Sequence, residues 1–393
     1  MRPRKRRGSM TQRCGSRPHR RYGRWFARKP QTVVVQPTSF CNMGCFYCYL
    51  RDKGLKNDML PATAAAVAES LAGLASIGHP LGLVWHGGEP LTLGTEKFSA
   101  LLAPFETLRQ DGRMHHYVQT NATLVTPAWC DLLEEFEFRV GVSIDGPAAL
   151  NTQRVDLRGR PAFERIMRGV GLLRERGIPF SVIAVVGREG IGHPEELLDF
   201  VATLGCHSVG FNIEETEGVN TERRPPTRDQ AEEFWRRVLA WSRSHRGPVI
   251  RELERISEYL SLARSGQKDD WDNRLLDPIP TVTWNGDVVL LSPELADTSD
   301  SAYADFLAGN VREKTIAHML REAPHLRYVR EFLTGLERCQ AECEFFDFCR
   351  GAQAGNRYFE NGSLATTETN YCRVSRQALV MALSTTAKKE QIA

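Results

Sequence analysis

Seven of the ten cysteines stand in two clusters whose spacing predicts metal chemistry. Cys41, Cys45 and Cys48 share one short segment, so their sulfur atoms are able to converge on one centre. Soft thiolates favour zinc or an iron–sulfur cluster. Zinc needs a fourth protein ligand, for which His86 is one candidate, whereas three thiolates on a four-iron cluster leave one iron without a protein ligand. We therefore expect an open site that can bind and activate a small molecule.

The second cluster lies near the C-terminus and comprises Cys339, Cys343, Cys349 and Cys372. Four thiolates can complete the ligand set of one further 4Fe–4S centre. The same four residues would also satisfy a structural zinc ion, because spacing alone does not separate the two metals. The sequence thus predicts a second, closed metal site without choosing its metal.

Alternating strands and helices must position these clusters. The hydrophobic pattern predicts strands over residues 32–36, 81–86, 116–120, 138–144, 180–186 and 208–213. It predicts helices over residues 61–77, 95–110, 127–137, 163–176, 194–204 and 228–245. Six strand–helix units imply an α/β fold with a parallel sheet, a partial (β/α)6 barrel of the TIM type. In such a barrel the chemistry gathers at the carboxyl ends of the strands.

The unusual polar motifs fall at those strand ends. The first cysteine cluster follows the first strand, and each later motif follows or ends a later strand. In chain order these later residues are Gly87, Gly88, Glu89 and Pro90, then Gln119 and Asn121, then Ser143 and Asp145, and then Glu214, Glu215 and Glu217. Their order and position together predict one active site at the barrel mouth.

The C-x3-C-x2-C segment, with Tyr47 before its last cysteine, and the Gly-Gly-Glu-Pro turn resemble the radical S-adenosylmethionine (SAM) superfamily. The resemblance implies a 4Fe–4S cluster on Cys41, Cys45 and Cys48, with SAM on the fourth iron as the source of a 5′-deoxyadenosyl radical. It also implies that Glu89 pairs with the ammonium of SAM. The full set of implied cofactor contacts is Gly87, Gly88, Glu89, Pro90, Gln119, Asn121, Ser143, Asp145 and Arg154.

The C-terminal cysteines resemble the last part of a SPASM domain, an extension found in many peptide-modifying radical SAM enzymes. That resemblance implies one auxiliary 4Fe–4S cluster on Cys339, Cys343, Cys349 and Cys372. Usual SPASM domains carry further cysteines for a second auxiliary cluster. Here no cysteine lies between Cys206 and Cys339, and Gln353 stands where another is expected. We therefore expect a single auxiliary cluster, with zinc as the alternative.

Several stretches resemble the cyclophane-forming peptide maturases of the GrrM/OscB type: residues 36–41, 209–220, 291–295, 309–311 and 355–360. This resemblance implies a ribosomally made precursor peptide as substrate and a flavodoxin- or ferredoxin-type electron donor. It implies a bond between an aromatic ring and the β-carbon of a nearby residue. Glu214, Glu215 or Glu217 would then accept a proton or hold the peptide. The plainer alternative is that these glutamates only solvate a loop or cap a helix.

Three other functions compete with this prediction. The first keeps the fold and converts a sulfatase side chain to formylglycine. The second is a non-catalytic thiolate–metal protein or nucleic-acid module, and the third is an iron–sulfur electron carrier. Metal analysis and an assay for 5′-deoxyadenosine separate the last two from an enzyme.

The composition is that of a globular chain of 393 residues, 41% of them hydrophobic and 25% charged. The sequence shows no membrane-spanning run and no secretory signal, so we expect a cytoplasmic protein. Residues 1–29 carry 12 of the 51 lysines and arginines and no Asp or Glu. This composition predicts a disordered tail. We do not expect nucleic acid to be its partner. The expected parts are this tail, a core barrel over residues 30–245, a bridging region over 246–320 and the auxiliary domain over 321–393.

Overall fold

A computed structural model describes residues 17–351 and 353–392 of the chain, with side chains described up to residue 386. Its strands form one sheet within these residues, in the order β10-β9-β8-β1-β2-β3-β4-β5-β6-β7. Their bounds are β1 Thr32–Val35, β2 Leu81–Trp85, β3 Met114–Thr120, β4 Arg139–Ser143, β5 Phe180–Val186, β6 Ser208–Ile213, β7 Val249–Ile250, β8 Thr281–Val282, β9 Asp287–Val289 and β10 Leu307–Asn310. All pairs from β8 through β1 to β7 are parallel, which confirms the α/β barrel class.

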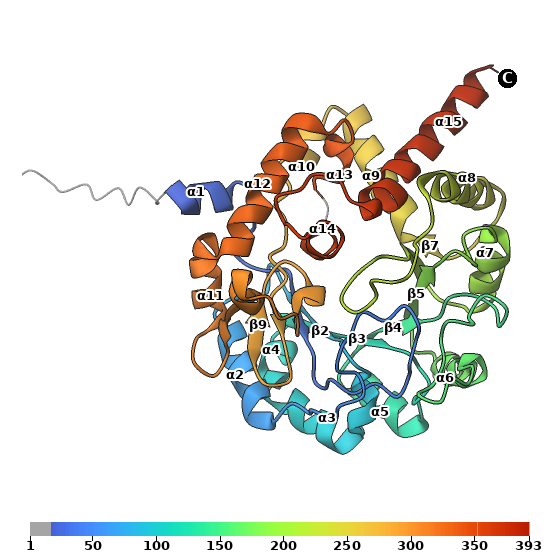
Figure 1. Ribbon diagram of the computed structural model, residues 1–393. Helices are drawn as coiled ribbons and strands as arrows, with labels where there is room; N and C mark the ends of the chain where they lie inside the picture. The colour runs from blue at the N-terminus through green and yellow to red at the C-terminus, as the bar shows by residue number, and fades with distance from the viewer. Residues whose placement is uncertain (1–16, 352, 393) are drawn as a thin grey trace, which may run out of the picture.

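Helices cover the outside of the sheet, and the C-terminal helices fill the arc between α8 and α2 (Figure 1). The helices of the barrel are α2 Pro61–Ala72, α3 Thr95–Leu102, α4 Glu106–Gln110, α5 Pro127–Glu135, α6 Phe163–Glu175, α7 Pro194–Thr203 and α8 Arg228–Ser244. The later helices are α9 Arg251–Arg264, α10 Lys268–Asp272, α11 Ile316–Glu322, α12 Arg327–Glu342, α13 Phe346–Cys349, α14 Ala354–Asn361 and α15 Ala378–Ile392. No helix in the described residues is long and apolar enough to cross a membrane.

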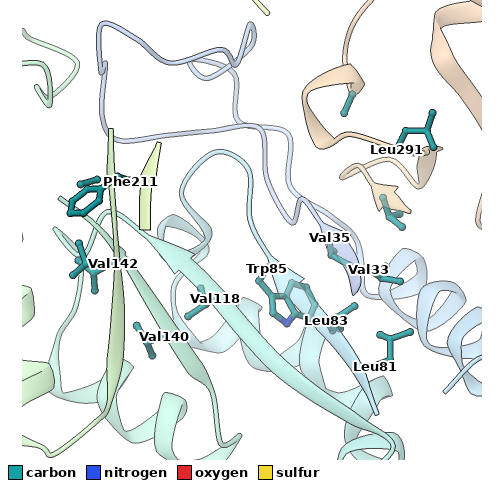
Figure 2. Close-up of a cluster of buried hydrophobic side chains, with 14 of the residues drawn as sticks. Val33, Val35, Leu81, Leu83, Trp85, Val118, Val140, Val142, Phe211 and Leu291 are labelled. Atoms are coloured by element: carbon teal, nitrogen blue, oxygen red, sulfur yellow. The ribbon is translucent and has the colours of Figure 1, made fainter. Parts of the chain in front are cut away.

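Side chains alternate along the strands between the helical layer and the barrel interior. Val118, Val140 and Val142 are buried, and Figure 2 shows them with other strand residues in one hydrophobic cluster. Gln119 and Ser143 project between them and line a cavity inside the barrel. The period of two in β3 and β4 therefore puts apolar residues under the helices and polar residues at the site, while β5 lines the cavity with Ile183 and Val185.

The region expected to bridge the barrel and the auxiliary domain extends the sheet at both edges. Val249–Ile250 (β7) pairs with β6, while Thr281–Val282 (β8) pairs with β1 and leads through β9 to β10. These strands have two to four residues, which is too short for a hydrophobic period to reveal.

The expectation of a disordered tail through residue 29 is wrong for residues 17–29. Arg17–Gly23 forms helix α1, and Tyr22, Trp25 and Phe26 are buried. Arg21 forms an ion pair with Glu337 of α12 at 2.7 Å. The apolar side chains outweigh the charge density here, because they bury surface against α12. Residues 1–16, including Cys14, lie outside the described residues.

Two glycines of α6 give a matched test of how this helix supports the site. A Cβ on Gly169 would lie 2.0 Å from the carbonyl oxygen of Ala122, next to Asn121, whereas a Cβ on Gly171 would meet nothing within 4 Å. We expect Gly169→Ala to lower the free energy of unfolding by about 1–3 kcal/mol through overpacking. We expect Gly171→Ala to raise it by about 0.5–1 kcal/mol, because alanine favours the helix. Urea unfolding measures both changes, and equal effects would contradict the close approach of α6 to the loop.

Candidate active site

The loop after β1 brings three thiols to one cavity. Cys41, Cys45 and Cys48 all line a cavity of 570 Å³ inside the barrel mouth. Burial raises the pKa of Cys41, and the negative charges of Glu89 and of the other two thiolates raise it further. Three partly buried thiolates repel one another, so this arrangement fits a cationic metal cluster that neutralises them.

The loop after β2 packs tightly on this cysteine loop. Gly88 has a φ of +57°, and a Cβ there would lie 2.4 Å from the carbonyl oxygen of Phe40. A Cβ on Gly87 would lie 2.6 Å from the side chain of Gln36. Both glycines are therefore required by contacts within the chain, and Gly88 also lines the cavity. Pro90 follows as the first residue of a short helix (η1, Pro90–Leu93) that fixes the end of the turn.

Glu89 is held by the next strand end. Its carboxylate accepts hydrogen bonds from Thr120 Oγ1 and the Asn121 backbone N–H, both at 2.7 Å, and from the Leu91 N–H at 3.2 Å. Burial raises the pKa of Glu89 to about 7, although these donors oppose the rise. A carboxylate so placed is suited to bind a cationic group in the cavity, since an adjacent positive charge favours its ionised form.

The ends of β3 and β4 add a second polar wall. Gln119 Nε2 donates to Ser143 Oγ at 2.8 Å, and both side chains line the cavity. Arg154 also lines it and forms a buried ion pair with Asp145 at 2.9 Å. Asp145 accepts a further bond from Tyr47 Oη at 2.7 Å and lies in an adjoining cavity of 370 Å³. The structure thus places Ser143 and Arg154 in the main cavity, while Asp145 fixes Arg154 and Tyr47 from behind.

Comparison with known proteins identifies the family. The sequence profile described as the Radical SAM superfamily matches residues 35–201. An uncharacterized protein of Synechocystis sp. is 32% identical over 354 residues, which span 87% of this chain and 88% of the relative. The chain belongs to the radical SAM superfamily.

Other relatives share the radical SAM barrel over about half their length. A serine-type anaerobic sulfatase-maturating enzyme of Klebsiella aerogenes is 32% identical over 194 residues, or 48% of each chain. Among solved structures, anSMEcpe with bound AdoMet superposes with a TM-score of 0.73 at 20% identity, covering 91% of this chain and 97% of that one. Streptococcus suis SuiB bound to precursor peptide SuiA gives 0.65 at 17% identity, covering 88% and 76%. At these identities the structural matches establish the fold, including its C-terminal extension.

The acidic loop that follows β6 lines the same cavity as the three thiols, which we call the main cavity. Glu214, Glu215 and Glu217 all line it, as the sequence predicts for the barrel mouth. Glu214 is engaged by Arg223, while Asn356 Nδ2 of α14 donates to Glu215 and, at 2.9 Å, to Glu217. Loss of hydration raises the pKa of Glu215 to about 7 and that of Glu217 well above its ordinary value. Glu215 and Glu217 therefore form a proton-holding pair beside the three thiols.

Sequence reasoning missed two partners of this pair. Glu294 lines the same cavity and its pKa is raised by burial, and Asn356 bridges the two carboxyls from the C-terminal region. The only signal was that both residues fall in stretches resembling the peptide maturases. Neither residue stands at a strand end of the predicted barrel. Each reaches the site because the chain that follows the barrel folds back over its mouth.

The acidic loop is joined to the cysteine loop through the backbone. Val219 N–H donates to the carbonyl oxygen of Tyr49 at 3.2 Å. Gly218 has a φ of +56°, and a Cβ there would lie 2.1 Å from the same oxygen. Only glycine permits this contact without displacement, so the position of Glu217 depends on that of the cysteine loop.

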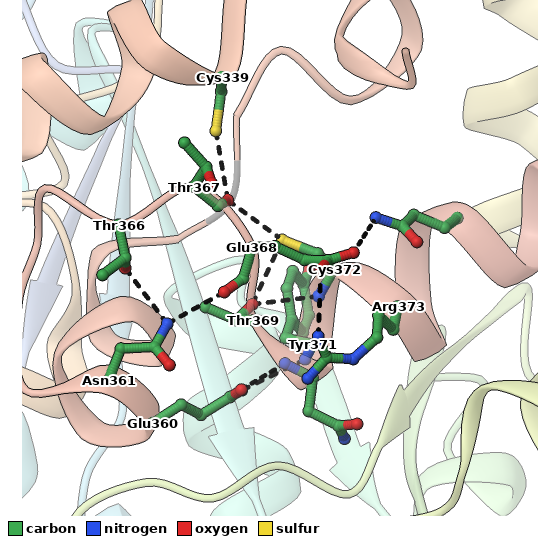
Figure 3. A network of polar contacts seen from close by, with 12 residues as sticks. Cys339, Glu360, Asn361, Thr366, Thr367, Glu368, Thr369, Tyr371, Cys372 and Arg373 are labelled. Atoms are coloured by element: carbon green, nitrogen blue, oxygen red, sulfur yellow. Dashed lines mark hydrogen bonds and ion pairs between the residues drawn. The ribbon is translucent and has the colours of Figure 1, made fainter. Parts of the chain in front are cut away.

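The four C-terminal cysteines surround a separate cavity of 410 Å³. Cys339 and Cys372 both approach the carbonyl oxygen of Thr367, at 3.3 and 4.0 Å, and Thr369 Oγ1 donates to Cys372 Sγ at 3.2 Å (Figure 3). The buried Arg357 donates to Cys339 Sγ at 3.3 Å, so positive charge already faces the thiolates. Cys343 and Cys349 complete the lining.

The thiols are free, and within residues 17–351 and 353–392 no three Cys, His, Asp or Glu side chains meet closely enough to hold one metal ion. The four auxiliary thiols line one cavity, and both a four-iron cluster and zinc remain compatible with this set of ligands. His86 lines the main cavity beside the three cysteines, but burial lowers its pKa to about 4. Gln353 lines the main cavity as well, where the resemblance to SPASM domains places a further cysteine.

The paired carboxyls predict a dependence of stability on pH. Because the folded chain raises the pKa of Glu215 to about 7 and that of Glu217 well above its ordinary value, their protonated forms stabilise it below pH 4.5, and this contribution is lost progressively as the pH rises above that. We expect Glu217→Gln in the metal-free protein to raise the melting temperature relative to wild type at pH 8 more than at pH 5. Glu135→Gln, at an exposed position, is the control. A difference that does not grow with pH would contradict the shared burial of the two carboxyls.

Proposed function

We propose that this radical SAM protein modifies a ribosomally made precursor peptide by joining an aromatic ring carbon to the β-carbon of a nearby residue. The observation that carries the proposal is the shared cavity of three thiols and a proton-holding carboxyl pair. The structural neighbour SuiB, crystallised with its precursor peptide SuiA, supports a peptide as the substrate class.

The residues divide the work as follows. When bound on Cys41, Cys45 and Cys48, the cluster and SAM supply the radical that removes the β-hydrogen. Glu89 holds the ammonium of SAM, and Gln119, Ser143 and Arg154 bind the rest of it along the second wall. Glu215, whose pKa is raised to about 7, accepts the proton that leaves the aromatic ring, and Glu217 lies beside it as a second carboxyl.

Ring closure also releases one electron, and we assign its uptake to the auxiliary site. The two cavities adjoin at Arg376, which lines both of them and so supports this assignment. Four thiolates leave an auxiliary 4Fe–4S cluster without an open iron, which suits electron transfer rather than substrate binding. A flavodoxin- or ferredoxin-type protein is the expected electron donor to the first cluster.

Oxidation of a side chain to formylglycine is the second candidate, because the barrel is 32% identical to a serine-type sulfatase-maturating enzyme over 194 residues. Conversion of serine to formylglycine and formation of one crosslink both remove two hydrogens, so intact mass does not separate them. Tandem mass spectrometry and reaction with an aldehyde-reactive hydrazide separate the two products.

The test is coexpression with precursor peptides encoded beside the gene. We expect a product that has lost two hydrogens per crosslink, that gives no fragments between the joined residues and that does not react with the hydrazide. A hydrazide adduct would establish formylglycine formation instead. Glu215→Gln should lower crosslinked product about 100-fold while SAM cleavage continues, because proton removal contributes about 10²–10⁴-fold to such steps.

A further inference from the structure

One part of the main cavity carries more positive charge than its own carboxylates neutralise. Arg251, Arg255 and Arg376 line this part, and Glu252 is the carboxylate among them. Arg251 is engaged by Glu252 and also donates to Asn212 Oδ1 at 2.9 Å. The guanidinium groups of Arg255 and Arg376 are therefore left facing the cavity.

Arg255 has no carboxylate partner in the described part of the chain. Its guanidinium carbon lies 5.5 Å from the ring centre of Trp271 and 5.9 Å from that of Phe348, so aromatic faces hold it in place. Its Nε is enclosed and makes no hydrogen bond. Burial and repulsion by Arg376 lower the pKa of Arg255 to about 10, while the nearby Cys349 thiolate opposes the fall, and the group stays charged at neutral pH. A guanidinium that aromatic faces hold in place, without a hydrogen-bonded anion, is suited to bind an anionic ligand.

Arg376 is partly engaged but also retains an open donor. One of its terminal nitrogens donates to Tyr371 Oη at 2.8 Å, while its Nε is enclosed without a partner. Arg376 lines both cavities, whereas Arg255 lines only the main one. Arg255 and Arg376 both feel the charge of the auxiliary Cys349 thiolate, while Arg357 is hydrogen-bonded to Cys339. Arg255 forms no hydrogen bond or ion pair with a carboxylate in the described residues, so it is open to an anion that enters the main cavity.

We propose that Arg255, assisted by Arg376, binds a carboxylate of the peptide substrate, from an Asp or Glu side chain or from the peptide C-terminus. This inference rests on the proposed peptide-modifying function and names one feature that its substrate must have. The planar guanidinium matches a carboxylate with two parallel hydrogen bonds. Ser375 and Gln353, which line the same cavity, provide further neutral donors.

The test uses the full-length protein with its clusters reconstituted and SAM bound, under anaerobic conditions. Isothermal titration calorimetry compares N-acetyl-Phe-Gly-Asp-amide with N-acetyl-Phe-Gly-Asn-amide, and N-acetyl-Phe-Gly-Gly with its amide. We expect the acidic peptide of one pair to bind about 10- to 100-fold more tightly than its neutral partner, as for other charge-assisted hydrogen bonds. The pair that shows the preference identifies the side chain or the C-terminus as the source of the carboxylate.

Variants assign the preference to Arg255. Arg255→Met should abolish it, and Arg255→Lys should retain part of it because the charge remains. Arg274→Met is the matched control, since Arg274 stacks on the same Trp271 ring at 4.5 Å but pairs with Glu258 and does not line the cavity. An equal preference in Arg255→Met and wild type, or none in wild type, would overturn the proposal.

Two further measurements separate this inference from the proposed function. If Arg255→Met weakens SAM binding about 10-fold, the arginine serves the cofactor's carboxylate and the proposal fails. If glutarate binds in an Arg255-dependent manner while neither acidic peptide is preferred, the anion site exists but its ligand is not a peptide, which contradicts both this proposal and the peptide substrate class. We expect unchanged SAM affinity and a peptide preference that follows Arg255.

Discussion

Cys41→Ala should abolish the formation of 5′-deoxyadenosine from SAM in the reduced protein. Cys41 is one of only three thiols that line the main cavity, and two thiolates do not hold a four-iron cluster with one open iron. We expect the iron content to fall by about four per chain, leaving the auxiliary site filled. Liquid chromatography of the nucleoside and chemical analysis of iron and sulfide measure both effects.

Cys206→Ala is the matched control for this loss. Cys206 is buried next to the carbonyl oxygen of Val201 and does not line the cavity, so its removal takes away one buried sulfur without touching the site. This variant should keep its iron and its 5′-deoxyadenosine activity. If Cys41→Ala still produced 5′-deoxyadenosine at the wild-type rate, the assignment of the three cysteines would be wrong.

Cys349→Ala should separate SAM cleavage from product formation. Cys349 lines the auxiliary cavity and not the main one. Its loss should therefore remove the auxiliary cluster and lower the iron content from about eight to about four per chain. The three thiols of the main cavity remain, and 5′-deoxyadenosine should still form. Crosslinked peptide should fall to the detection limit, because no acceptor remains for the electron released on ring closure.

Metal analysis of the same variant also tests the nature of the auxiliary site. If the wild-type protein contained about four irons and one zinc per chain, and Cys349→Ala lost only the zinc, the auxiliary site would be structural. An undiminished yield of crosslinked peptide with the auxiliary cluster absent would equally contradict its role as electron acceptor.

The six central strands were predictable because each carries a clear hydrophobic signal, and five of them are followed by a strand-end motif. The expected ranges 180–186 and 208–213 coincide with Phe180–Val186 and Ser208–Ile213. The alternation that buries Val118 also turns Gln119 into the cavity, so motif and fold support the same interpretation. In such segments local pattern and tertiary packing agree, and one sequence is sufficient.

The rest of the site depends on contacts between distant segments, which no local pattern encodes. Asn356 reaches Glu217 across 139 positions of sequence, and Arg357 of α14 reaches Cys339 of α12. In the sequence, Arg255 is only one charged residue of an amphipathic segment. Its lack of a carboxylate partner becomes visible only in the structure, where Trp271 and Phe348 pack against it. The prediction of a disordered tail was wrong for a related reason, since Trp25 and Phe26 are buried by partners hundreds of residues away in the sequence.

The backbone bond from Val219 to Tyr49 ties the acidic loop to the cysteine loop. Because the carbonyl oxygen of Tyr49 lies directly against Gly218, a displacement of one loop requires a displacement of the other. A change in either loop is therefore transmitted across the cavity mouth, so the thiols and the carboxyls keep their relative positions together.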